Sequence, residues 1–319
     1  MKRRTVLVGI VAMVASVFAA PAMAAFPEKP VTVICPWAPG GGTDVLLRAL
    51  SKEAEKFLGQ PITVVNQTGG AGAIGHNAIR AARPDGYTVG MITFELNSLP
   101  PQGLVPFTWK NFDPMMRINS DPAALTVRKD APYNTVRGFL DYAKAHPDEI
   151  TIGNSAPGSV WHIAAGLVAD KTGIKVKHVP FDGAAPAVTS LVGGHLTAVA
   201  VSVAEVRGQV QAGNLKILGV MSAERDKIFP DVPTFKEQGV DVEFYTWRGL
   251  GLPKGVPPAI KAKLTDAFKK AMDTPAFKEL AAKASLNLAY QDSADFSKFL
   301  DQNYKDVEAV MKSIGLAKK

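Results

Sequence analysis

Three loops of small residues in this chain each lead into a predicted helix, and each could bind an anion. They end at Gly41-Gly42-Thr43, at Gly72-Ala73 and at residues 155–160. The first turn of a helix leaves backbone N–H groups without intrahelical acceptors, and the helix dipole adds positive potential there. The first two loops contain no Lys or Arg. We therefore expect backbone amides, helped by the hydroxyls of Thr43, Ser155 and Ser159, to hold a small anion.

The residues that come nearest to a catalytic group are His162 with Ser155 or Ser159. Residues 153–158 read Gly-Asn-Ser-Ala-Pro-Gly, which is not a nucleophile elbow because the second glycine comes one place late. The five histidines show no metal-ligand spacing. A Ser/His hydrolase of a small ester or amide remains the alternative from another class. We expect a protein that is not an enzyme and that holds no metal.

Two glycine-rich segments could suggest a nucleotide cofactor. Residues 70–75 read Gly-Ala-Gly-Ala-Ile-Gly, which matches G-x-G-x-x-G literally. The dinucleotide fingerprint should begin where a strand ends, but residues 66–69 intervene. The glycines at 40–42 are not followed by the Gly-Lys-Ser/Thr of a phosphate-binding P-loop. We expect no cofactor.

Short apolar, β-branched runs alternate with amphipathic stretches along the chain. This rhythm predicts strands at residues 31–35, 62–65, 87–93, 124–127, 151–153, 176–179, 198–203 and 217–221. It predicts helices at residues 43–58, 73–82, 136–145, 160–172, 187–192, 258–273, 275–284 and 293–314, with a loop at 250–258. Such βαβ units imply parallel sheets with helices on their faces. We therefore expect an α/β fold of two lobes with a helical tail.

Proline-bearing segments at Asp121-Pro122 and residues 230–233 separate the two α/β units. The chain should cross between the lobes near residues 124 and 246. Lobe 1 would then consist of residues 25–123 and 247–319, and lobe 2 of residues 124–246. The last helix should pack on lobe 1.

The first 24 residues have the features of a cleavable secretory signal peptide. Lys2, Arg3 and Arg4 supply three of the seven net positive charges, residues 6–20 are apolar, and Ala22-Met23-Ala24 is a cleavage site. The mature protein, cleaved after Ala24, is therefore expected to be exported. No dense basic run remains, so nucleic acid is not an expected partner. The single cysteine, Cys35, lies in an apolar strand and should be a buried, inert thiol.

A series of motifs in order along the mature chain resembles one protein family. They include Phe26-Pro27-Glu28-Lys29-Pro30, Pro36-Trp37-Ala38-Pro39-Gly40-Gly41, Gly69-Gly70-Ala71-Gly72, Pro84-Asp85-Gly86-Tyr87-Thr88, His178-Val179-Pro180-Phe181, Pro230-Asp231-Val232-Pro233-Thr234 and Trp247-Arg248-Gly249-Leu250. The chain resembles the Bug family, the TctC-type periplasmic substrate-binding proteins of tripartite tricarboxylate transporters. The resemblance covers essentially the whole mature chain.

This resemblance implies a Venus-flytrap fold, type II-like, with a ligand cleft between two lobes. It implies a periplasmic receptor, which we expect to be a monomer, that delivers a small organic carboxylate to inner-membrane permease subunits. A ligand-sensing receptor of the same fold would share the cleft and differ in its partner. The ligand-binding residues expected on this basis are Trp37, Gly41, Gly42, Thr43, Gly72, Ala73, Glu95, Ser155, Ser159, His162, Asp182, Gly183, Ser202, Glu205 and Trp247.

Several residues depart from the family pattern where they could affect specificity. Trp37 stands where the family usually has Phe, and Glu95 follows a strand end that is usually small and polar. Glu205 lies close to Ser202 in the second lobe, and Arg248 follows Trp247 where an apolar residue is usual. Two carboxylates beside an anion site would repel a polyanion. If they face the cleft, the ligand should carry an amine or a neutral polar group at its far end. Arg248 is the alternative carboxylate binder.

Overall fold

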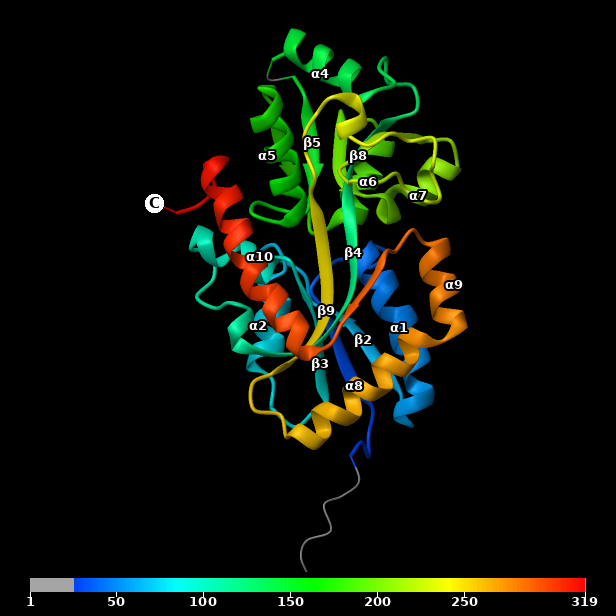
Figure 1. The fold of residues 1–319 in the computed structure, drawn as a ribbon, viewed down its shortest axis with the longest axis vertical. Helices are drawn as coiled ribbons and strands as arrows, with labels where there is room; N and C mark the ends of the chain where they lie inside the picture. The colour runs from blue at the N-terminus through cyan, green and yellow to red at the C-terminus, as the bar shows by residue number, and fades with distance from the viewer. Residues whose placement is uncertain (1–25, 148, 319) are drawn as a thin grey trace, which may run out of the picture.

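The computed structural model describes residues 26–147 and 149–318, so the predicted signal peptide lies outside the described residues. The described chain is a mixed α/β fold with two lobes (Figure 1). None of its helices is both long enough and apolar enough to cross a membrane.

The first lobe is built around a parallel sheet in which β1 lies between β2 and β3. Its N-terminal elements are β1 (Val31–Cys35), α1 (Gly42–Leu58), β2 (Ile62–Asn66), α2 (Ala73–Ala81), β3 (Thr88–Thr93) and α3 (Glu95–Ser98). The C-terminal elements are β9 (Tyr245–Pro253), α8 (Pro258–Asp273), α9 (Pro275–Lys283), β10 (Leu288–Gln291) and α10 (Ser293–Ser313). Strand β9 pairs with β3, β10 pairs with β4 (Phe112–Arg128), and α8 and α9 contact α1. Helix α10 contacts α3 and β4 and also α5 (Val160–Thr172) of the second lobe. The leucines of α1, such as Leu46 and Leu50, form one buried cluster with Leu264 and Phe268 of α8. Burial of each such side chain stabilises the fold by roughly 1.5–3 kcal/mol.

The second lobe has its own parallel strands, with β5 between β6 and β7. Its elements are α4 (Val136–Ala145), β5 (Thr151–Asn154), α5 (Val160–Thr172), β6 (Lys177–Pro180), α6 (Ala184–Val192), β7 (Ala198–Ser202), α7 (Val203–Gln211) and β8 (Leu215–Val220). Short 3₁₀ turns lie at Pro100–Gln102, Trp109–Asn111 and Lys236–Gln238. The carboxyl ends of the parallel strands in both lobes lead into the loops that hold the candidate site.

The 17-residue strand β4 (Phe112–Arg128) joins the two lobes. Its first part, Phe112 to Pro122, pairs with β9, and its last part, Ala123 to Arg128, pairs with β7 and β8. The sheet order is β2-β1-β3-β9-β4-β7-β5-β6, and β8 and β10 also pair with β4. Figure 1 shows β4 and β9 running side by side between the lobes. The exact lobe boundaries at residues 123/124 and 246/247 stay a prediction.

The expected loop at residues 250–258 is wrong in its first part, because residues up to Pro253 belong to β9. Gly251 lies inside the expected loop, and Gly249 comes just before it. The sheet requires a glycine at position 249 because its neighbours pack so closely. A Cβ on Gly249 would lie 2.5 Å from the Phe296 ring and 2.6 Å from the Met116 carbonyl oxygen. The strand expected at residues 124–127 is likewise only the last part of β4.

The cysteine prediction is confirmed. Cys35 is completely buried in β1, and burial raises the pKa of its thiol to about 11. A thiol with so high a pKa carries almost no thiolate at neutral pH, and the thiolate is the reactive form.

Candidate ligand-binding site

A small cavity of about 20 Å³, with room for about one water molecule, lies between the lobes, and residues of both lobes line it. Its lining residues are Trp37, Ala38, Gly41, Gly42, Thr43, Thr93, Glu95, Ser155, Val160, Trp161, Ala184, Glu205, Thr246 and Arg248. These residues come from the N-terminal ends of helices and from the ends of strands. The loops before α1 and α5, which are two of the three loops predicted to bind an anion, therefore both border the cavity.

The N-terminus of α1 reaches the cavity without a capping side chain. Its N-cap residue is Gly41, which makes no side-chain hydrogen bond. The N–H groups of Gly42 and Thr43 donate to no acceptor in the described part of the chain. Asp44, in the same turn, instead accepts from the Gly40 N–H at 3.0 Å and pairs with Arg48 at 2.9 Å. The first turn of α1 thus presents free amide donors to the cavity.

The N-terminus of α5 already holds a carboxylate of the protein itself. Glu95, from the first lobe, accepts a hydrogen bond at its Oε1 from the Val160 N–H at 3.0 Å. Its Oε2 accepts from the Thr93 hydroxyl at 2.5 Å. Glu95 is 1% exposed, and burial raises the pKa of its carboxyl group. The N-cap hydroxyl of Ser159 accepts from the Ser155 hydroxyl at 3.0 Å.

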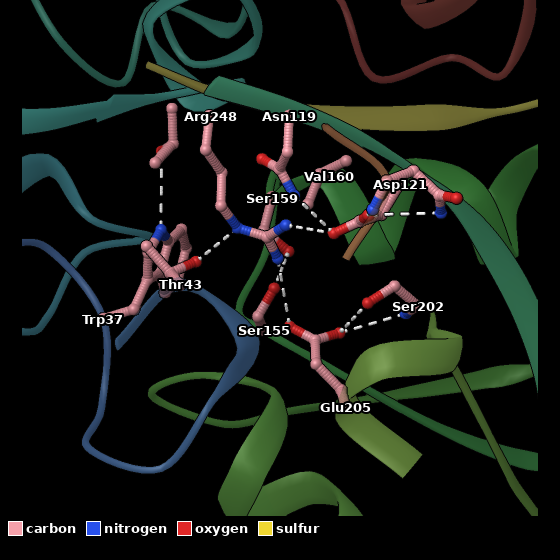
Figure 2. A network of polar contacts seen from close by, with 12 residues as sticks. Trp37, Thr43, Asn119, Asp121, Ser155, Ser159, Val160, Ser202, Glu205 and Arg248 are labelled. Atoms are coloured by element: carbon pink, nitrogen blue, oxygen red, sulfur yellow. Dashed lines mark hydrogen bonds and ion pairs between the residues drawn. The ribbon is translucent and has the colours of Figure 1, made fainter. Parts of the chain in front are cut away.

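Arg248 lies at the centre of a buried ionic network (Figure 2). Its Nη1 donates to Asp121 Oδ2 at 2.6 Å, and its Nε donates to the Thr43 hydroxyl at 2.8 Å. Its Nη2 makes a longer contact of 3.4 Å with Glu205 Oε1. Asp121 also accepts from the backbone N–H of Asn287 at 2.8 Å. The charge of Arg248 is therefore neutralised chiefly by Asp121.

Glu205 both caps a helix and faces the cavity. It is the third residue of α7, and its Oε2 accepts from the backbone N–H of Ser202 at 3.0 Å and from the Ser202 hydroxyl at 3.2 Å. Burial raises the pKa of Glu205, and the nearby charge of Arg248 opposes that shift. The Ser202 side chain is completely buried behind this cap.

Thr93 connects Glu95 to the wall formed by Trp37. The indole Nε1 of Trp37 donates to the Thr93 hydroxyl oxygen at 3.4 Å. The Thr93 N–H lies 3.3 Å from the Nε2 of His76, to which it donates. His76 is completely buried, and burial lowers its pKa to about 3, so its ring is neutral. Gly72 packs behind this wall, because a Cβ there would lie 3.3 Å from the Trp37 ring.

The structure brings together seven of the residues expected from the sequence. Trp37, Gly41, Gly42, Thr43, Glu95, Ser155 and Glu205 line the cavity. Ser159 and Ser202 lie directly behind it through their hydrogen bonds. Gly183 lies at the contact between the lobes, where a Cβ would lie 3.3 Å from the Ala38 side chain.

Other expected site residues lie elsewhere. Ala73 and Asp182 line a wider hollow beside the cavity, together with Leu104 and Phe181. Trp247 points away from the cavity and donates from its indole to Asn303 Oδ1 of α10 at 2.8 Å. Alternation along β9 explains this, because it turns Arg248 toward the cavity and its neighbour Trp247 to the other side.

His162 also points away from the cavity. Its Nδ1 accepts from the Gly158 N–H at 2.9 Å, and its ring packs edge-on against His178. Burial lowers the pKa of His162 to about 4. In the described residues, neither Ser155 nor Ser159 shares a hydrogen bond with this ring. The Ser/His arrangement that a hydrolase needs is therefore not formed here.

Asp121 was not expected at the site, and Arg248 was named only as an alternative carboxylate binder. The available signal for Arg248 was a charged residue within an apolar run. Its side chain points to the opposite face of the strand from that of its neighbour Trp247. Asp121 is adjacent to Pro122 and therefore suggested a linker. It lies instead within β4, where the paired strands bring it within 2.6 Å of Arg248.

Two α/β lobes that close over a cavity lined by free helix amides define a two-lobed solute-binding protein. Comparison with known proteins gives the family. The family model "Tripartite tricarboxylate transporter family receptor" (TctC) matches residues 46–316, and the chain belongs to this family.

Similar proteins span nearly the whole chain. A Cupriavidus necator protein named "UPF0065 protein in gbd 5'region" is 34% identical over 300 residues, which cover 92% of this chain and 90% of that protein. A TctC solute-binding protein from Polaromonas, solved with no ligand, is 41% identical with a TM-score of 0.66; the match covers 90% of this chain and 99% of that one.

Two solved relatives contain carboxylates. MatC from Rhodopseudomonas palustris, with bound malate, is 27% identical with a TM-score of 0.84, over 89% of this chain and 99% of that one. A second R. palustris protein, with adipate, is 25% identical with a TM-score of 0.88, over 92% and 99% of the two chains. The Polaromonas protein is more similar to this chain in sequence, but its ligand-free structure has a lower TM-score than these two ligand-bound structures.

Proposed function

We propose that this protein is an exported receptor that captures a small organic carboxylate in the cavity between its lobes. It then delivers the ligand to the inner-membrane permease of a tripartite tricarboxylate transporter. The observation that carries this proposal is the uncapped N-terminus of α1. Its free N–H groups at Gly42 and Thr43 face an enclosed cavity, where a carboxylate would satisfy them.

Binding and lobe closure are coupled in this proposal. Each lobe supplies only part of the cavity wall, so a ligand that contacts both lobes stabilises the closed arrangement. In the closed arrangement Trp37 and Trp161 would cover the ligand, and Ser155 would add a hydroxyl donor.

The direct test is calorimetry on the mature protein, residues 25–319, with mono-, di- and tricarboxylates and amino acids. At least one carboxylate should bind and raise the melting temperature, because it binds only the folded state. Small-angle scattering should show a smaller radius with a saturating ligand. If no carboxylate binds, or if a tight ligand leaves the radius unchanged, the proposal fails.

Delivery and export need separate measurements. Cells that contain the cognate permease should take up labelled ligand only when this protein is present, whereas a sensory receptor would bind the ligand without supporting uptake. The exported protein should begin at Ala25 by mass spectrometry and reside in the periplasm. Size-exclusion chromatography with light scattering should give the mass of a monomer. A cytoplasmic, uncleaved protein would contradict the export step.

A further inference from the structure

We propose that the cavity accepts only one ligand carboxylate, and that Glu95 and Glu205 bind an amino group on the same ligand. The ligand would thus be an amine-bearing monocarboxylate. This inference rests on the proposed function and specifies its ligand class.

The first step concerns the anion site at α5. Glu95 is buried and holds the Val160 N–H, which is the donor that a ligand carboxylate would otherwise use. This bond joins the first lobe to the second, so Glu95 occupies the α5 site when the lobes are closed. A ligand that presented a second carboxylate here would have to displace Glu95.

The second step is the balance of charge around the cavity. Arg248 is the only Lys or Arg among the residues that line it. Its shortest ionic contact, at 2.6 Å, is with Asp121, whereas Glu205 is 3.4 Å away. Glu95 receives only neutral donors, from Thr93 and Val160. Glu95 therefore has no positive partner, and Glu205 shares Arg248 with Asp121, whereas buried charges normally require a partner.

The third step is the remaining hydrogen-bonding capacity of these two groups. An ionised carboxylate can accept about four hydrogen bonds. Each oxygen of Glu95 accepts one hydrogen bond from the protein, and the Oε1 of Glu205 has only the long contact with Arg248. An ammonium group has three donors and one positive charge, so it supplies what both carboxylates lack. A further carboxylate would add repulsion instead.

The α1 amides and Glu205 also lie close together. A Cβ on Gly42 would lie 3.4 Å from the Oε1 of Glu205. A ligand whose carboxylate meets the Gly42 and Thr43 amides therefore brings its neighbouring atoms toward Glu205. This proximity favours a short spacer between carboxylate and amine, as in α- and β-amino acids.

The test uses probes that differ only in the far end. The mature protein is titrated at pH 7.5 with β-alanine, butanoate and succinate, which share a carboxylate and two methylenes and end in ammonium, methyl and carboxylate. A second series extends each chain by one methylene, and a panel of α-amino acids completes the set. We expect an amine-bearing probe to bind at least tenfold more tightly than its methyl and carboxylate counterparts, as for hydrogen bonds to charged groups.

The outcomes separate this inference from the proposed function. Tighter or equal binding of the dicarboxylates overturns the inference and leaves a carboxylate receptor. Tighter or equal binding of the methyl-ended probes does the same. If no probe binds and the wider carboxylate screen is also negative, both fail.

Variants identify the residues responsible. Glu95→Gln and Glu205→Gln keep a side-chain oxygen for the helix amides but remove the charge, and each should reduce the preference for the amine at least tenfold. Glu279→Gln, on the exposed face of α9, is the matched control and should leave it unchanged. Circular dichroism and melting curves verify folding. An unchanged preference in either folded cavity variant overturns the role given to that residue.

Discussion

The N-termini of α1 and α5 are similar in sequence, but the backbone amides are free at α1 and occupied at α5. Both follow loops of small residues, and both face the same cavity. The α1 terminus has no side-chain cap and keeps free amides, whereas at α5 Ser159 caps the helix and Glu95 occupies the Val160 N–H. The difference shows that a helix terminus only offers an anion site. Whether a ligand or the protein fills it depends here on a residue 65 positions away in the chain.

The largest effect should come from the arginine that anchors the α1 side. Arg248→Met leaves Asp121 and Glu205 buried without their positive partner, which should lower the free energy of unfolding by about 3–5 kcal/mol in urea denaturation. The control is Arg225→Met, whose solvent-exposed pair with Glu237 should contribute little to stability. Equal losses in the two variants would show that Arg248 is not a buried structural cation.

A bulky side chain at the uncapped N-terminus of α1 should weaken ligand binding without unfolding the protein. A Cβ on Gly42 would meet Glu205 and Arg248 at 3.2–3.3 Å, so Gly42→Val should crowd the amide site. We expect ligand affinity to fall by about a hundredfold or more, roughly 2.7 kcal/mol, in calorimetry. Gly208→Val is the control, because a Cβ at Gly208 meets nothing within 4 Å. Retained affinity in Gly42→Val would place the ligand carboxylate elsewhere.

Removing the Glu95 carboxylate from the N-terminus of α5 should change the pH dependence of protein stability. Burial raises the folded-state pKa of Glu95, although Thr93, the Val160 N–H and Arg248 oppose that shift. The contribution of Glu95 to the stability of the ligand-free protein is therefore fully present below its ordinary pKa and is lost as pH rises through the raised value.

Glu95→Gln removes this contribution. The unfolding free energy of the wild type relative to the variant should therefore fall as pH rises, with a slope of at most about 1.4 kcal/mol per pH unit. Urea denaturation of both proteins from pH 5 to 8 measures this difference. A difference that stays constant over this range, or that grows with pH, contradicts a raised pKa for Glu95.

The smallest effect should come from the tryptophan that lies outside the cavity. Trp247→Phe removes the 2.8 Å hydrogen bond to Asn303 and keeps an aromatic ring beside Phe296. The unfolding free energy should fall by about 1 kcal/mol. Ligand affinity should not change, because Trp247 does not line the cavity. A tenfold loss of affinity would instead place its indole in the binding site.

The local elements were largely determined by sequence. The helix at residues 136–145 was predicted with its observed bounds, and the strand at 31–35 likewise. Such elements depend on patterns within one stretch of chain: apolar periodicity, caps such as Thr135, and the glycines and prolines that end them. The three loops that we expected to bind an anion were identified in the same way, and two of them border the cavity.

What tertiary structure alone decided is which loops meet and which charges fill them. The sequence placed Asp121 in a linker and Gly251 in a loop, but pairing of β4 with β9 puts both in strands and brings Asp121 to Arg248. Glu95 could have faced solvent by sequence alone, and it is buried because the second lobe closes over it. Strand pairing and contacts between the lobes bring together residues that are far apart in the chain. Local sequence patterns therefore cannot predict these contacts. For this reason the fold class followed from the sequence, and the charge balance of the cavity followed only from the assembled lobes.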